Sequence, residues 1–186
     1  MKIATSILFL TMLSACSGTP TETHYYLLRD DSMAQSRQLT LSTEYAMGSV
    51  TISSYLDRPG LVLETNNGEV RPALKHQWAE PVQESIDNFL RTQISLSMGE
   101  DIFPADVSPA RNELEIKINQ LHGTQDGEAL IVAYWWVRND DKVISAHQFS
   151  ETRSLNTDGY GALVDAERSL LVALAESIAT TLKEAG

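Results

Sequence analysis

The sequence offers few residues that could do chemistry, and their spacing forms no familiar catalytic or metal site. The four histidines are His24, His76, His122 and His147. They show neither an HExxH motif nor a pair at i and i+4, the spacings that bring imidazoles to one zinc ion. The chain has no GxSxG turn and no glycine-rich phosphate loop, and turn chemistry explains the neighbouring Asp126 and Glu128. We therefore expect no enzyme, no metal and no cofactor.

The residue with the clearest chemistry is Cys16, the only cysteine. It follows Lys2, an apolar run over residues 3–13, and the small residues Ser14 and Ala15. This order predicts a signal peptide over residues 1–15, because the run is about half the ~20 residues that a membrane-spanning helix needs. The segment ending in Cys16 also resembles the bacterial lipoprotein signal. That resemblance implies cleavage before Cys16 and attachment of acyl chains to it, the alternative being an ordinary secretory signal.

The lipoprotein resemblance also indicates the membrane to which the protein is sent, because Ser17 rather than Asp follows the cysteine. In enteric-type bacteria this implies the outer membrane, with the domain facing the periplasm. Residues 16–23 are small and polar, which predicts a lipidated tether before a single domain over residues 24–186. Eight residues from Cys16 to His24 span at most about 26–29 Å, so the domain must stay near the membrane.

The charge and cysteine content exclude two further classes. The formal net charge is −11, with 25 acidic against 14 basic residues, so nucleic acid is not an expected partner. A lone cysteine committed to lipid permits no disulfide. Stability must therefore come from packing.

The first half of the domain predicts strands followed by a helix. Aromatic and apolar residues over 24–29 predict a first strand, and alternation within 39–52 predicts one or two more. Asn66-Asn67-Gly68 between apolar segments at 61–65 and 69–71 predicts a hairpin. Helical spacing after Pro81 predicts a helix over about 80–97, with the proline in its first turn.

The second half predicts three strands and a final helix. Alternation over 113–119, a continuous apolar run over 129–137 and a strand over 143–152 predict a meander, the middle run resembling a strand covered on both faces. Asp158 is placed to cap a helix with one apolar stripe. The stripe comprises Leu163, Leu170, Leu171, Leu174, Ile178 and Leu182. We expect an α+β two-layer sandwich, with a mixed or antiparallel sheet of about six or seven strands and two main helices on one face.

Two short clusters have no catalytic logic but are distinctive. They are Tyr55-Leu56-Asp57-Arg58-Pro59 and Trp78-Ala79-Glu80-Pro81. With Tyr25-Tyr26-Leu27 after the tether, they resemble the ABC-type transport auxiliary lipoproteins in order and spacing. The resemblance implies a non-enzymatic subunit of an intermembrane phospholipid-transport complex, partnered by an MCE-type periplasmic ring protein. The alternative is an outer-membrane assembly or scaffold lipoprotein without a role in lipid transport.

Each cluster also has a structural interpretation. Trp78 and Pro81 are compatible with a packed helix start, and a guanidinium with five donors requires oxygen partners. Arg58 is therefore expected either to pair with Glu80, which would join the two clusters, or to contact a partner protein.

Trp135 and Trp136 form a candidate interface in the apolar run. Successive strand residues point to opposite faces, so helices on only one side would leave one tryptophan toward solvent. Because a large open apolar patch marks an interaction surface, we expect a homo-oligomer. The alternative is that a loop or other strands cover this face.

Overall fold

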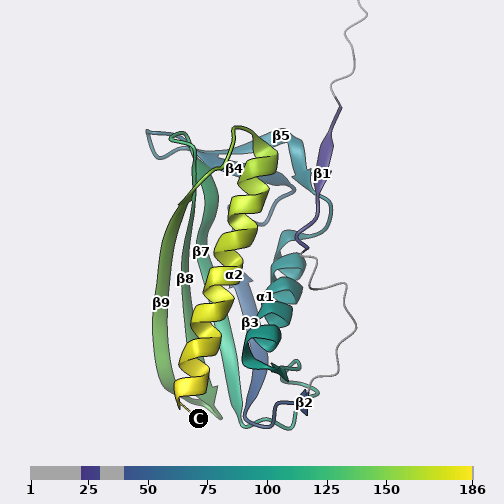
Figure 1. Cartoon of the computed structure of the whole chain (residues 1–186), viewed down its shortest axis with the longest axis vertical. Coiled ribbons are helices and arrows are strands. Elements are labelled where there is room, and N and C mark those ends of the chain that lie inside the picture. Colours follow the sequence, from purple (N-terminus) through teal and green to yellow (C-terminus); the bar gives the residue numbers. More distant parts are fainter. Residues whose placement is uncertain (1–21, 30–39, 186) are drawn as a thin grey trace, which may run out of the picture.

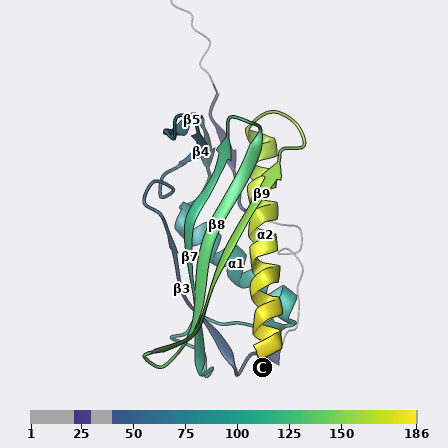
Figure 2. The ribbon, with the colours of Figure 1, turned by 90° about the vertical axis from the view of Figure 1, so that its left-hand side faces the viewer.

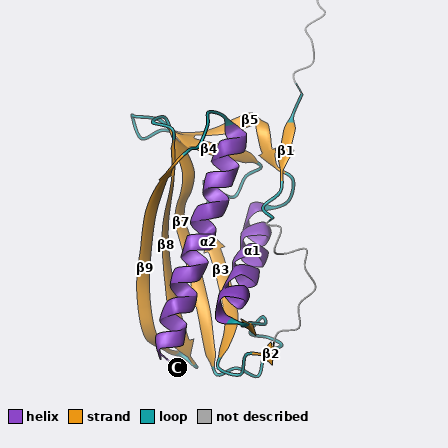
Figure 3. Cartoon of the chain, in the orientation of Figure 1, coloured by secondary structure: helices purple, strands orange, loops and turns teal. Residues whose placement is uncertain are grey.

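A mixed sheet of seven strands carries two helices in an α+β fold (Figures 1 and 3). The computed structural model describes residues 22–29 and 40–185, so Cys16 and most of the predicted tether lie outside them. The elements are β1 His24–Tyr26, β2 Thr40–Leu41, β3 Tyr45–Ile52, β4 Gly60–Glu64, β5 Val70–Trp78, α1 Val82–Met98, β6 Glu100–Asp101, β7 Asn112–Thr124, β8 Glu128–Asn139, β9 Lys142–Ser154 and α2 Tyr160–Ala185.

The sheet combines a local meander with long-range parallel pairs. Its strand order is β1-β5-β4-β7-β8-β9, with β3 paired to the first part of β7 and β2–β6 forming a separate small ladder. The β7–β8–β9 meander is antiparallel, as the alternation predicts. By contrast, β1 with β5, β3 with β7, and β4 with β7 are parallel. These pairs join segments that are far apart in the sequence, and they bring β1 beside the hairpin.

The predicted hairpin is confirmed as β4 and β5. Gly68 has φ 75°, and the Thr65 amide donates to the Glu69 carbonyl across the turn at 2.8 Å. The second strand, however, continues well beyond Arg71 to Trp78. Pro72 and the weakly apolar residues after it gave no strand pattern. Only pairing with β1 and β4 extends the strand this far.

Both helices present the predicted apolar faces to the sheet. The whole α2 stripe is buried, as are Ile86, Phe89 and Ile94 of α1. The first helix begins at Val82 because Pro81, with ψ 126°, is still extended. The last begins at Tyr160, two residues after Asp158. Neither of these helices is long and apolar enough to cross a membrane, within the residues that the structure describes.

The two helices cover only one face of the sheet (Figure 2). On β8, Ile131, Ala133 and Trp135 are buried beneath the helices. The alternate set, Leu130, Val132, Tyr134 and Trp136, is half-buried or exposed. The interpretation of this run as a strand covered on both faces is therefore wrong. The run is continuously apolar, yet its second face has no helical layer.

Candidate functional site

The two distinctive clusters meet at one cleft. Antiparallel pairing sets the start of β4 against the end of β5, and the Trp78 amide donates to the Pro59 carbonyl at 2.7 Å. A cleft of about 450 Å³ opens there, lined by Arg58 and Trp78 from the clusters and by Tyr25 from β1. All three segments that carry the family resemblance therefore contribute to one surface feature.

Within the clusters, some residues build the fold and others face outward. Tyr55 is half-buried against the core and Leu56 is buried, so these two hold the loop in place. Trp78 also packs partly against the core, as a packed helix start requires. The exposed members are Asp57, Arg58, Pro59, Ala79, Glu80 and Pro81. The outward set forms the rim that a partner would meet.

The expected ion pair between Arg58 and Glu80 is not the one that forms. Glu80 instead pairs with Arg29, whose Nη2 lies 2.7 Å from Oε1. Within residues 22–29 and 40–185, the Arg58 guanidinium has no hydrogen-bond or ion-pair partner. The cleft therefore holds one cation whose five donors face solvent. Nothing in the sequence indicated that Arg29 would be the partner of Glu80. Arg29 follows β1, and β1 reaches β5 only through a parallel pairing between segments some fifty residues apart.

A partly buried chain of polar contacts holds Tyr55 in place. Its hydroxyl lies 2.8 Å from His122 Nδ1, and His122 Nε2 lies 2.9 Å from Glu64 Oε2. One neutral tautomer satisfies both contacts, with the Tyr55 O–H donating to Nδ1 and Nε2–H donating to the carboxylate. Burial is the largest of the causes that together raise the pKa of Tyr55 to about 12, and the negative charge of Glu64 acts in the same direction. The phenol therefore stays protonated and attaches the loop to β7.

This network offers no free catalytic group. Both nitrogens of His122 are engaged, and the ring is 2% exposed, so it has no nitrogen to present to a substrate. Throughout the described part of the chain, no three His, Cys, Asp or Glu side chains are grouped as a metal site would require. The contacts among Tyr55, His122 and Glu64 therefore position the loop that carries the first cluster.

Glu167 is a carboxyl group in the core beneath the site. It is 2% exposed on α2, and burial raises its pKa well above the ordinary value. The sequence held a signal that was missed: Glu167 lies four residues after Leu163 and three before Leu170, on the predicted apolar stripe. Burial therefore favours the neutral form of this carboxyl, and no described cation pairs with it to offset that effect.

Protonation of Glu167 makes stability depend on pH. Between the unfolded pKa near 4.3 and the higher folded pKa, the native state binds more protons, so the free energy of unfolding falls as pH rises, by about 1.4 kcal/mol per unit. Glu167→Gln should remove this loss, and its stability relative to the parent should grow from pH 5 to pH 8 in denaturant unfolding. The exposed Glu176→Gln on the same helix is the control. Parallel pH profiles for parent and Glu167→Gln would contradict the prediction.

Strand β1 is held firmly against the site. His24 stacks on His76 at 4.9 Å between centroids, and His76 stacks on Tyr160 of α2 at 4.1 Å. The Ala79 amide donates to the Tyr26 carbonyl at 2.8 Å, and Arg168 donates to the Leu27 carbonyl at 3.3 Å. The cleft is therefore tied closely to the point where the chain leaves for its N-terminus.

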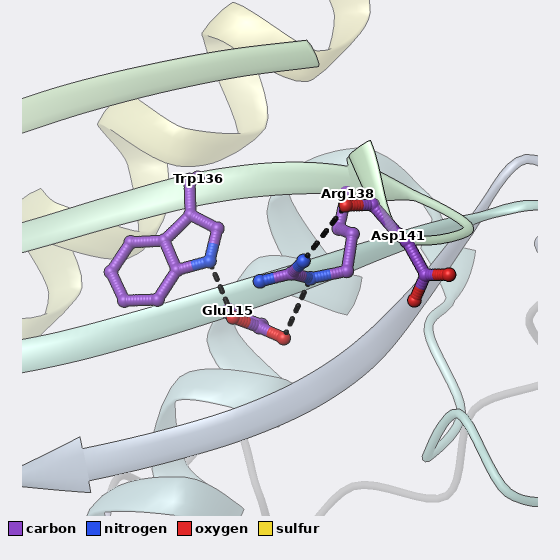
Figure 4. A network of polar contacts seen from close by, with 4 residues as sticks. All are labelled: Glu115, Trp136, Arg138 and Asp141. Carbon is purple, nitrogen blue, oxygen red and sulfur yellow. Dashed lines mark hydrogen bonds and ion pairs between the residues drawn. The ribbon is translucent and has the colours of Figure 1, made fainter. Parts of the chain in front are cut away.

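The two tryptophans of the candidate interface have different environments. Trp135 is 2% exposed under the helices and stacks on His147 at 3.9 Å, so it is core. Trp136 lies on the uncovered face, where its indole N–H donates to Glu115 (Figure 4). Arg138 Nε donates to the same carboxylate at 3.3 Å. The uncovered face is therefore partly polar, and only Trp136 of the pair remains a candidate contact.

Comparison with known proteins gives one family. The family model described as ABC-type transport auxiliary lipoprotein component matches residues 26–179. The chain is also similar to the protein named intermembrane transport lipoprotein PqiC of Escherichia coli (strain K12), at 24% identity over 173 residues that cover 92% of each chain. The protein of the same name from Shigella flexneri matches equally.

Two solved structures have the same fold. A crystal structure of an uncharacterized protein matches with a TM-score of 0.74 at 20% identity, over 87% of this chain and 99% of that one. A crystal structure of a protein from Xanthomonas campestris matches with a TM-score of 0.65 at 13% identity, over 83% and 91%. At these identities the likeness shows the fold alone.

Proposed function

Because the chain belongs to the family of ABC-type transport auxiliary lipoprotein components, we propose that it is a non-enzymatic subunit of an intermembrane phospholipid-transport complex. In this proposal Cys16 carries the acyl chains that anchor the protein to the outer membrane, with the domain in the periplasm. Its partner is an MCE-type ring protein, and the complex contributes to envelope integrity. The relative named as an intermembrane transport lipoprotein supports this assignment.

The observation that carries the proposal is the cleft between the two clusters. Its rim combines the Arg58 guanidinium, which pairs with none of the described residues, with the half-buried ring of Trp78, beside the strand that leads to the membrane. Arginine and aromatic residues are the types that dominate binding energy at protein interfaces. Since no described side chain satisfies Arg58, its donors are available to a carboxylate or carbonyl of the partner.

Arg58→Ala tests the docking role. Because the side chain is exposed and has no partner among the described residues, we expect the free energy of unfolding to change by no more than an ordinary surface substitution does, about ±0.5 kcal/mol, which thermal or denaturant unfolding measures. Loss of a charged contact that becomes buried on binding costs about 2–5 kcal/mol, so capture of the ring protein in mild detergent should weaken more than tenfold.

The control is Arg111→Ala, which removes another exposed arginine from the loop before β7. Equal loss of capture in both variants would indicate a general effect of charge and would argue against the cleft. If the parent protein brings down no ring protein but retains other envelope partners, the scaffold function would replace transport.

We also propose that the domain self-associates through the uncovered face around Trp136. Tyr134 and Trp136 lie there with Leu130 and Val132, on the face of β8 opposite the one that α1 and α2 cover. A ring or dimer would present several clefts together, so weak individual contacts would give strong overall binding through effective concentration. The short tether favours this arrangement, because it keeps neighbouring copies in one plane near the membrane.

A further inference from the structure

The end of the molecule where β1 begins displays unusually exposed apolar side chains. Leu74 of β5 is 82% exposed and Tyr25 of β1 is 65% exposed. Both strands lie at the same end of the long axis (Figure 1). Scattered apolar residues are normal on protein surfaces, so exposure alone decides nothing. The backbone around Leu74 is the more specific observation.

A bulge in β5 holds Leu74 outward. The β5 partner changes from Pro72 for Val62 to Gln77 for Gly60, so residues 73–76 have no register partner on β4. The Gln77 side chain donates to the Leu74 carbonyl at 3.1 Å and braces the bulge from within. A Cβ on Gly60 would lie 2.4 Å from the Ala73 carbonyl oxygen, which shows how closely the chain folds back. Bulges of this kind re-aim a side chain.

The bulge lies close to the predicted anchor. His24 pairs in register with His76, two residues from Leu74, and Cys16 lies eight residues before His24. That connection spans at most about 26–29 Å when fully extended. The opposite end lies much farther away, because the thirteen residues of β7 run about 40 Å from the far loop back to β4. The acyl chains therefore hold the Leu74 end beside the bilayer.

The chemistry of strand β5 suits a lipid surface. Strand β5 carries Arg71 and Lys75 and no carboxylate, in a chain with a net charge of −11. Arg71 pairs with Glu69, whereas Lys75 is exposed directly beside Leu74. Leucine partitions into the acyl boundary, tyrosine into the headgroup layer, and lysine extends its ammonium to lipid phosphate.

We propose that the Leu74 bulge, together with Tyr25 and Lys75, inserts into the interface of the bilayer that holds the acylated Cys16. The inference rests on the proposed lipid anchor and adds a second, protein-mediated attachment to it. Two attachments fix the direction of the long axis, so the far end of the domain points into the periplasm. The cleft, which Tyr25 also lines, then opens at the level of the membrane surface.

The test uses the full, lipidated chain in vesicles of phosphatidylethanolamine and phosphatidylglycerol. Since acylation blocks the only native thiol, Leu74→Cys provides a single site for a fluorescent label. The control is Val107→Cys, also strongly exposed at 64% but in the loop before β7 at the opposite end. A phospholipid with a nitroxide near its headgroup serves as the quencher. We expect loss of most of the fluorescence at position 74 and none at position 107.

Three outcomes decide the matter. Equal and weak lipid quenching at both positions overturns the inference. Shielding of position 74 from aqueous iodide without lipid quenching also overturns it, because a second copy or a protein partner then covers the bulge. Failure of the chain to float with the vesicles overturns the anchor and this inference with it, whereas a floating chain unquenched at position 74 leaves the anchor intact.

Discussion

We expect Cys16→Ser to release the protein from the outer membrane. Serine has no thiol to acylate, and each lost chain of about a dozen methylenes removes roughly 10 kcal/mol of membrane attachment. The variant should appear as an uncleaved or soluble periplasmic species and should not support transport. Because the core residues all lie after position 24, the domain should still fold. Membrane flotation and circular dichroism measure the two parts separately.

Ser17→Ala is the matched control for this change. It alters the neighbouring residue but leaves the thiol and the small-residue pattern before it, so it should float with outer membranes like the parent. If the Cys16→Ser protein also floats there, another part of the chain attaches it to the membrane. An unfolded Cys16→Ser domain would instead show that the N-terminal segment belongs to the core.

We expect the adjacent tryptophans to respond in opposite ways. Trp135→Ala removes a fully buried ring that stacks on His147, and such truncations cost about 3–5 kcal/mol, a large share of a typical domain's stability. Trp136→Glu changes a half-exposed ring on the uncovered face and should leave the domain folded. Denaturant unfolding of residues 17–186 compares the two free energies.

The same pair tests self-association. Light scattering on residues 17–186 should give a mass above one chain for the parent, and Trp136→Glu should lower it. A monomeric parent at high concentration, with Trp136 open to aqueous quenchers, would show that the uncovered face has no partner copy. Similar destabilisation by the two substitutions would contradict the strand orientation that places only Trp135 in the core.

Local pattern was enough to predict most secondary structure. The Asn66-Asn67-Gly68 turn, the apolar stripe of the last helix and the alternation along β7 each depend on residues that are neighbours in sequence. Two helices against one sheet, either mixed or antiparallel, followed from the order of these elements, and the structure confirms this architecture with a mixed sheet. The two clusters also indicated the family before any geometry was known, and the family model confirms that resemblance.

Long-range pairing decided what the sequence left open. Parallel contact of β1 with β5 brings Arg29 to Glu80 and leaves Arg58 without a partner among the described residues, and no local pattern encodes that choice. Likewise, the period of a strand requires Trp135 and Trp136 to point to opposite faces, but it does not say which face the helices cover. That depends on where α1 and α2 pack. The position of each charge and each ring therefore follows from contacts between segments that are distant in the chain.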